Sequence, residues 1–321
     1  MLQSPKFCLL ICLSVVQTVG LKAQDRIPLS DKTDLVFASK EKGKELIAEN
    51  DHFLSRIEML ERQIRLGSPE PVAQEKYVEQ LQSGVQDWTE ADKKKMTQAV
   101  EGLKEAFGKY DLPFPAEIYL TRVSNQVESG APHCRGANVI CPDRLLRGGA
   151  TRVMAHELFH VLSNQNADLR DKFYEVIHFV KCNEIELPEA IKKRRLTNPD
   201  APNYEHYVEL EHGEGKILAT PFIQSSTPEY APGGLFANMD LKLLVLEKEG
   251  DEVVVKMKDG KAELLAIPAV PDYMKKIGSN TGYIIHPEET VADNFVLLML
   301  NPDGAKDTWV LDGMKKVLEG K

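Results

Sequence analysis

The sequence predicts a mixed α+β protein, with helices near both ends and a β-rich stretch between them. Three observations predict it. Apolar residues recur at helical spacing within 33–112, residues 117–162 follow the order strand, loop, strand, helix, and residues 206–269 contain short strand-like runs separated by turn signals. This order favours a helical and α+β frame that holds a β-rich insertion.

In the N-terminal part, three helices are expected from the period of the apolar residues and from capping signals. Gly67 marks the end of the first helix, and Thr89 followed three positions later by Asp92 is typical of a capping box. The expected helices are Leu46–Ile64, Val72–Leu81 and one that begins at Thr89 and carries apolar residues as far as Phe107.

The middle of the chain is expected to fold as two strands followed by two helices. His178 lies among apolar residues of the second of these helices, so we expect it to be packed and not to act as a ligand. The expected strands are Glu117–Val123 and Ala137–Pro142, and the expected helices are Gly149–Leu162 and Asp168–Cys182.

From about residue 197 the chain becomes rich in turns and strands. Thr197–Asn203 is a turn-rich connection, and the pairs Gly250-Asp251 and Asp259-Gly260 are typical of hairpin turns. The expected strands are His206–Leu210, Ile217–Gln224, Leu241–Glu247, Val253–Met257 and Glu263–Ile267, and the expected helices that follow are Pro287–Leu300 and Lys306–Leu318.

The candidate chemistry begins with the pentapeptide His156-Glu157-Leu158-Phe159-His160, which has the HExxH pattern of a zinc hydrolase. Positions four apart share one face of a helix, so His156 and His160 can reach one metal ion. Glu157 follows the first His and can take a proton from a water molecule at the fourth coordination position.

The alternative is a core helix whose two His residues are hydrogen-bonded while Glu157 lies at the surface. The flanking residues are uncharged and mostly bulky and apolar, which suits a buried helix. Two imidazoles and a carboxylate in one apolar turn are costly to bury without a partner, and a divalent cation is the simplest partner. The pattern therefore favours a metal site.

A hydrolytic zinc usually has three protein ligands and one water, so a third ligand is needed. The helix itself does not continue into HExxHxxGxxH, because Ser163 and Asn166 stand at the Gly and His positions. A later helix that begins at Pro287 offers Glu289 and Asp293, four positions apart on one face. The alternative is that the acids in this first turn only interact favourably with the helix dipole and bind no metal.

The strand–loop–strand–helix order and this later acidic pair resemble the zincin metallopeptidases, and among them the thermolysin-like gluzincin branch. The resemblance implies one Zn²⁺ bound by His156, His160 and Glu289, with Asp293 hydrogen-bonded to a ligating His. It also implies that Asn138–Cys141 forms a sheet edge where an extended substrate docks. It covers Glu117–Leu162 and the segment around Glu289.

The gap of 129 positions between His160 and Glu289 is longer than is usual in that branch, and it leaves the substrate class open. A donor for the oxyanion of the transition state is also needed. Tyr283 and His286 are the favoured candidates because they enter the site together with Glu289. The other candidates are Tyr204, His206 and His212, and none of the five belongs to a recognised motif.

The first residues are typical of a secretory signal, with Lys6 before an apolar stretch that is too short for a membrane span. We therefore expect an exported protein, periplasmic or secreted and bacterial. The formal charge of −9 argues against nucleic acid as a partner. After residue 23 three cysteines remain, of which Cys134 and Cys141 are the nearest in sequence if two form a disulfide.

The expected organisation has five parts. They are a signal peptide at 1–23, a helical region at 24–112, a zincin-like core at 113–196, a β-rich insertion at 197–280 and a helical segment with the third ligand at 281–321.

The function that these features favour is zinc-dependent hydrolysis of peptide bonds outside the cytoplasm, with a peptide or protein as substrate. A second hypothesis is a non-catalytic exported zinc-binding protein, in which a fourth protein ligand such as His286 replaces the water. A third is hydrolysis of an amide that is not a peptide.

Overall fold

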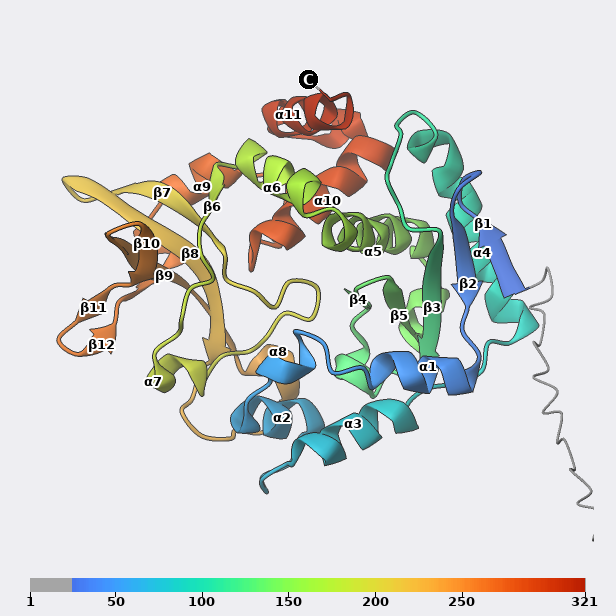
Figure 1. The fold of residues 1–321 in the computed structure, drawn as a ribbon, viewed down its shortest axis with the longest axis horizontal. Coiled ribbons are helices and arrows are strands. Elements are labelled where there is room, and N and C mark those ends of the chain that lie inside the picture. Colours follow the sequence, from blue (N-terminus) through green and yellow to red (C-terminus); the bar gives the residue numbers. More distant parts are fainter. Residues whose placement is uncertain (1–24, 321) are drawn as a thin grey trace, which may run out of the picture.

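The computed structural model describes residues 25–320, so the expected signal peptide at 1–23 lies outside the described residues. The chain is a mixed α+β protein with several sheets, which confirms the predicted class. Figure 1 shows the two larger sheets on opposite sides of the molecule, with the helices α5 and α10 between them.

The first sheet has the strand order β1-β2-β3-β5-β4. The strands β2, β3 and β5 run parallel to one another, whereas β1 and β4 are antiparallel to their neighbours. Its strands are Arg26–Pro28 (β1), Asp34–Phe37 (β2), Glu117–Val123 (β3), His133–Arg135 (β4) and Asn138–Pro142 (β5).

Two sequence-based expectations about this sheet are wrong. Asp34–Phe37 lies in a region predicted to be helical, but it forms the strand β2 because it pairs with Glu117–Leu120 of β3. Asn138–Cys141 was expected at a free edge, but β4 covers it through antiparallel pairing. The edge of the sheet beside α5 is therefore His133–Arg135.

The second sheet is antiparallel, with the order β10-β9-β8-β7-β6 and with β13 also paired to β9. Both predicted two-residue turns are confirmed: Gly250-Asp251 joins β9 to β10, and Asp259-Gly260 joins β11 to β12. The strands are Phe179–Lys181 (β6), His206–His212 (β7), Gly215–Ser225 (β8), Met239–Glu249 (β9), Glu252–Val255 (β10), Met257–Lys258 (β11), Lys261–Ala262 (β12) and Leu264–Ala266 (β13).

The helices agree with the predicted ones at several capping signals. Thr89 is the N-cap of α4, and its side chain accepts a hydrogen bond from Asp92 N. The described helices are Lys40–Ile47 (α1), Met59–Leu66 (α2), Gln74–Ser83 (α3), Glu90–Phe107 (α4), Ala150–Gln165 (α5), Ala167–Val176 (α6), Glu189–Lys192 (α7), Gly234–Ala237 (α8), Asp272–Ile277 (α9), Pro287–Leu300 (α10) and Thr308–Leu318 (α11).

Two predicted helices are shorter than expected. The stripe Leu46–Ile64 is divided between α1 and α2. The helix expected over Asp168–Cys182 stops at Val176, and the chain then turns through His178, which has a positive φ of 65°. His178 is exposed and not in the core, although its ring contacts that of Trp309. Among residues 25–320, no helix combines the length and the apolar character that crossing a bilayer requires.

A core of apolar side chains fixes α5 against α10. Phe159 of α5 lies with its ring 5.4 Å from that of Phe173 in α6 and 5.2 Å from that of Phe295 in α10, and all three side chains are fully buried. Burial of three such rings contributes several kcal/mol, at roughly 1.5–3 kcal/mol each. This packing holds the two helices that carry the candidate metal ligands in one fixed relation.

A buried ionic cluster, formed by Glu61, Arg65 and Glu128, joins α2 to the rest of the molecule. Arg65 pairs with both carboxylates, and Tyr77 donates a hydrogen bond to Glu128. Glu61 also accepts hydrogen bonds from the backbone and hydroxyl of Thr197, at 2.6 and 2.8 Å. The cluster therefore anchors the start of the connection Thr197–Asn203.

Candidate metal centre

The helix α5 presents both histidines of the HExxH pattern to the same space. Their ring centroids lie 4.7 Å apart, as expected for positions i and i+4 of one helix. The residues between and around them on α5 are almost entirely buried, so the helix crosses the core and not the surface. His160 is 1 % exposed, and His156 keeps a small accessible area.

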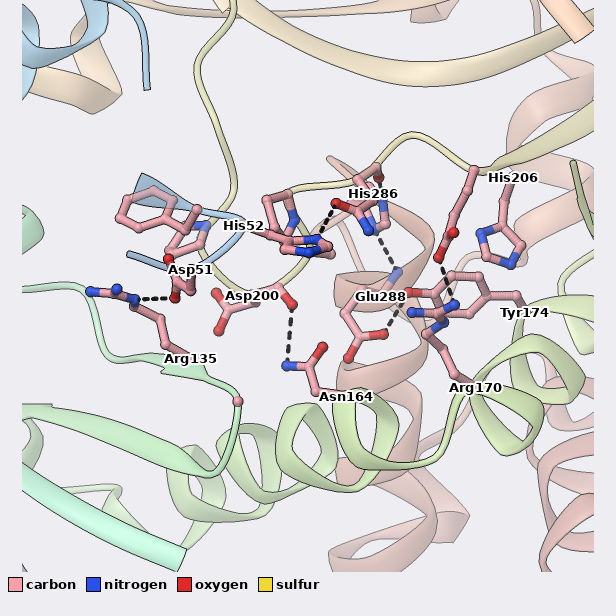
Figure 2. A pocket seen from close by; sticks show the side chains of 17 residues that line it. Asp51, His52, Arg135, Asn164, Arg170, Tyr174, Asp200, His206, His286 and Glu288 are labelled. Atoms are coloured by element: carbon pink, nitrogen blue, oxygen red, sulfur yellow. Dashed lines mark hydrogen bonds and ion pairs between the residues drawn. The ribbon is translucent and has the colours of Figure 1, made fainter. Parts of the chain in front are cut away.

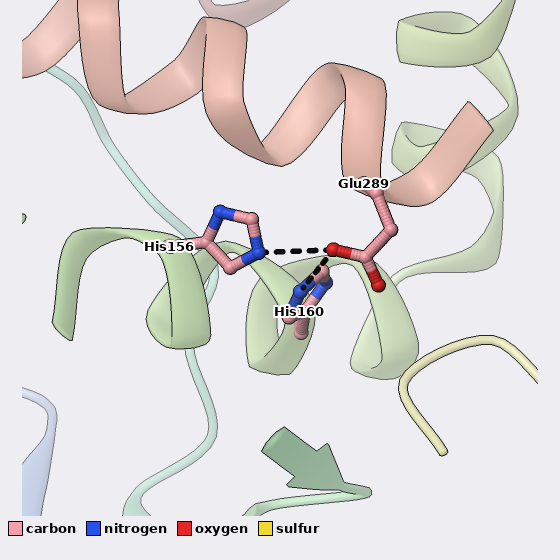
Figure 3. A group of neighbouring side chains, drawn as sticks. All are labelled: His156, His160 and Glu289. Atoms are coloured by element: carbon pink, nitrogen blue, oxygen red, sulfur yellow. Dashed lines mark hydrogen bonds and ion pairs between the residues drawn. The ribbon is translucent and has the colours of Figure 1, made fainter. Parts of the chain in front are cut away.

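The third predicted ligand comes from α10, which begins at Pro287 with His286 as its N-cap. Glu289 Oε2 lies 3.0 Å from His156 Nε2 and 3.4 Å from His160 Nε2, as Figure 3 shows. Its side chain is fully buried. The structure thus brings His156, His160 and Glu289 together, although 129 positions separate the last two.

Two further carboxylates hold the other nitrogen of each ring. Asp293 Oδ1 lies 3.3 Å from His156 Nδ1, and Glu288 Oε1 lies 2.8 Å from His160 Nδ1. A carboxylate on Nδ1 fixes the proton there and leaves Nε2 free to act as an electron-pair donor. Both Nε2 atoms therefore face Glu289.

The sequence did not favour Glu288 as a ligand, because the residue four positions after it is Ala292, whereas Glu289 is followed at that spacing by the acid Asp293. In the structure it is a positioning residue for His160, and it also accepts hydrogen bonds from Ser163 at 2.7 Å and Tyr174 at 2.5 Å. Consecutive residues on a helix point about 100° apart, so Glu288 and Glu289 reach opposite sides of the His160 ring. The only feature of the sequence that pointed to Glu288 was its position next to Glu289 in the first turn of α10.

The electrostatics of the site follow from the density of buried acids. Burial alone would lower the pKa of His156, but hydrogen bonds to Asp293 and Glu289 raise it to about 9. Burial would raise the pKa of Glu289, but the charge of His160 and the hydrogen bond to His156 hold it well below its usual range. Without a metal, the negative charge of the buried acids is therefore balanced by protons on the histidines. A bound cation could balance the same charge instead.

Two buried atoms beside the histidines have no hydrogen-bond partner among the described residues. They are Glu157 Oε2 and His160 Nε2. Glu157 is 4 % exposed, and burial raises the pKa of its carboxyl. Unpartnered buried polar atoms are costly, so a group that both atoms could contact would stabilise the site.

The donor set fits a divalent transition metal. Ligand atoms at about 2.0–2.2 Å from a tetrahedral zinc ion lie roughly 3.3–3.6 Å apart. Glu289 Oε2 lies 3.0 and 3.4 Å from the two imidazole Nε2 atoms, which is close to this spacing. The ligand atoms of the three residues all lie within 4.8 Å of one another. Imidazole and carboxylate are ligands that zinc accepts in hydrolytic sites.

Two residues of the connection Thr197–Asn203 complete the surroundings. Asn198 donates a hydrogen bond of 2.7 Å to Glu289 Oε1, and Asp200 Oδ1 lies 3.9 Å from His160 Nε2. Asp200 forms a second group with Glu157 and His160 whose ligand atoms lie within 4.8 Å of one another. No motif in the sequence marked Asn198 or Asp200, because a turn-rich connection gives no period from which to place them.

The two oxyanion candidates lie in different places. Tyr283 has its ring stacked on that of His156 at 6.0 Å and is 41 % exposed, so it lies at the mouth of the site. The charge of Glu289 and burial raise the pKa of its hydroxyl, so the group keeps its proton. His286 caps α10 through Nδ1, which accepts from Glu288 N, and its Nε2 lies 3.3 Å from Asn203 O.

The three cysteines after residue 23 are all free thiols in the structure. Cys134 and Cys141 lie on the adjacent strands β4 and β5 and are fully buried.

No protein-family model, no curated protein and no solved structure matches this chain.

Proposed function

We propose that this protein is an exported zinc-dependent metallopeptidase that hydrolyses peptide bonds. One observation carries the proposal: two imidazoles, each with its Nδ1 held by a carboxylate, direct Nε2 toward the buried carboxylate of Glu289. Structural histidines in a core rarely need two dedicated acids and a shared third one. Metal-ligating histidines regularly have such partners.

The arrangement of elements supports the same proposal. A sheet of three parallel strands with an antiparallel strand at each edge lies beside the HExxH helix, and a second helix brings in the acid. This is similar to the zincin pattern named above. The edge strand β4, His133–Arg135, takes the place that the resemblance gave to Asn138–Cys141. An edge strand offers backbone groups with which an extended peptide can pair.

The residues of the site can be given roles on this basis. Zinc bound there would supply Lewis acidity, which lowers the pKa of a coordinated water to about 7. Glu157 would accept the proton of the attacking water and return it to the leaving amine. Tyr283 would donate its hydroxyl proton in a hydrogen bond to the oxyanion, because it retains that proton and lies over His156.

The direct experiment is to purify residues 24–321, measure bound zinc, and assay cleavage of a peptide library. We expect one zinc per chain. Glu289→Ala should lose most of the zinc, because it removes one of three protein ligands. Glu105→Ala, which replaces an exposed acid of α4, is the control and should bind zinc like the parent protein. Equal zinc content in both variants would reject Glu289 as a ligand.

A second prediction concerns the positioning carboxylates. Asp293→Asn and Glu288→Gln should each weaken zinc affinity by about 10- to 100-fold, because each removes the charge that orients one imidazole. The measurement is competition for zinc with a chelator of known affinity. An affinity that stays unchanged in both variants would show that the histidines do not bind the metal through Nε2.

The alternative is a non-catalytic exported zinc-binding protein. The observation that favours it is the near-complete burial of the site: Glu289, His160 and Glu157 are 0, 1 and 4 % exposed. In that case the fourth protein group would be Asp200, whose Oδ1 lies 3.9 Å from His160 Nε2. His286, the fourth ligand considered from the sequence, instead contacts Glu288 N and Asn203 O. Stoichiometric zinc without cleavage of any peptide, in the parent protein and in variants that open the site, would favour this function.

A further inference from the structure

The segment Thr197–Asn203 lies across the candidate metal centre and closes it. It connects the zincin-like part of the chain to the second sheet, and its residue Asp200 is 6 % exposed. The Asp200 carboxylate faces Glu157 and His160, and among residues 25–320 the buried atoms Glu157 Oε2 and His160 Nε2 have no hydrogen-bond partner. A substrate carbonyl that approached Glu157 would have to enter this same space.

Specific hydrogen bonds hold the segment there. Asp200 Oδ1 accepts a hydrogen bond of 2.6 Å from Cys134 N, a backbone amide of the edge strand β4. Asn198 binds Glu289 Oε1, and Asn164 of α5 donates to Asp200 O at 3.5 Å, the contact drawn in Figure 2. The segment therefore uses the edge strand, a proposed metal ligand and the HExxH helix as its docking partners.

Both ends of the segment are also fixed. Thr197 is bound by Glu61 and Arg65 of the buried ionic cluster, and Asn203 contacts His52 and His286. Pro199 and Pro202 restrict the backbone between these anchors. The segment is thus short, restricted in its backbone and anchored at both ends, and it places the carboxylate of Asp200 in the site. These are the properties expected of an internal inhibitory segment.

A cavity lies on each side of the segment. One has a volume of about 360 Å³ and includes Arg135 of β4, Asn164, Asp200 and His286 in its lining (Figure 2). The other, of about 60 Å³, includes His133 of β4, Asn198, Asp200 and Tyr283. Asp200 lines both cavities, and β4 reaches both. The segment therefore separates two cavities that both reach the edge strand.

We propose that Thr197–Asn203 is an inhibitory plug, and that Asp200 occupies the place of the substrate carbonyl until the plug is lifted. This inference rests on the proposed peptidase function. The occupant of the opened cleft would be an extended peptide that pairs with β4, where Cys134 N is released by Asp200. The protein is therefore latent as folded, and any event that frees the segment activates it.

Asp200→Ala tests the plug. The matched control is Asp303→Ala, which replaces an exposed aspartate of the short 3-10 helix Pro302–Gly304. Two rates are measured on the zinc-loaded protein: removal of zinc by an excess of chelator, and cleavage of a peptide library. The hydrogen bond of 2.6 Å to Cys134 N ties the plug to the edge strand, so its loss should accelerate both rates by about tenfold. Asn164→Ala, which loosens the plug without removing the acid, should accelerate both rates by less.

The outcomes separate the plug from the peptidase function. Faster zinc removal by Asp200→Ala without cleavage by any variant would reject the peptidase and the inhibitory role together, and would fit Asp200 as a fourth zinc ligand. Rates in Asp200→Ala equal to those of Asp303→Ala, in a protein that binds zinc and cleaves peptides, would overturn the plug and leave the peptidase standing. Loss of cleavage in Asp200→Ala that retains its zinc would also overturn it, since an inhibitory group cannot be needed for turnover. A parent protein without zinc would reject both.

Discussion

Replacement of Glu157 by Gln is expected to leave zinc binding intact and to lower peptide cleavage by about 100- to 10,000-fold, the range lost when a general base is removed. The amide of Gln has nearly the shape of the carboxyl group but cannot accept a proton at neutral pH. Glu157 is not among the three proposed ligands, so the metal should remain. The assay compares zinc content and kcat/KM of the variant with those of the parent protein, both in the Asp200→Ala background if the parent is latent.

The same substitution has a stability consequence that serves as its control. Glu157 Oε2 is buried without a hydrogen-bond partner among the described residues, and burial raises the pKa of the carboxyl. A neutral side chain of the same shape is therefore not expected to destabilise the fold. An unchanged or higher melting temperature together with lost cleavage would identify a chemical role. Undiminished cleavage would reject Glu157 as the base.

Replacement of Arg65 by Leu is expected to have the largest effect on stability, a loss of about 3–5 kcal/mol in the free energy of unfolding. Arg65 forms ion pairs with both buried carboxylates, those of Glu61 and Glu128, and it is the only cation among residues 25–320 that does so. Its removal would leave two buried acids without a counter-charge, beside a leucine that cannot hydrogen-bond to them. Chemical denaturation followed by circular dichroism measures the change.

The matched control is Lys104→Ala, which removes a cation from a more exposed pair with Glu101 on α4. Such pairs contribute about 1 kcal/mol or less, because water and salt screen them. A similar small loss in Arg65→Leu would show that the buried cluster is not important for stability. Because the cluster also anchors Thr197, the Arg65 variant should release the plug even at temperatures where the rest of the molecule remains folded.

The sequence alone predicted those features that depend on neighbours within a few positions. The helix Pro287–Leu300, the strand Glu117–Val123, the Thr89 cap and both two-residue hairpin turns are as expected. Helical spacing also placed His156 and His160 on one face. In each case the determining interaction is local: an i to i+4 relation, a side chain that caps the next turn, or a pair of turn residues that tolerates the required backbone angles.

Other features depended on partners far away in the chain. Asp34–Phe37 is a strand only because Glu117–Leu120 lies beside it, and β4 covers the expected sheet edge because the chain turns back between residues 135 and 138. His178 was expected in the core because its neighbours are apolar, but the helix ends before it and the residue is exposed. A four-residue strand carries too little pattern of its own to be recognised.

By itself, then, the sequence indicated which residues could bind one metal ion, because the types and the helical spacing of His156, His160, Glu289 and Asp293 can be recognised within short segments. The resemblance had already implied Glu289 as a ligand and Asp293 as the partner of a ligating His; only the tertiary structure showed that Asp293 contacts His156 and that Glu288 contacts Nδ1 of His160. It alone placed Asp200 of a turn-rich connection beside Glu157. The physical reason is that such distances are set by the packing of α5 against α10 and by the ends of the connection, and no local periodicity encodes either.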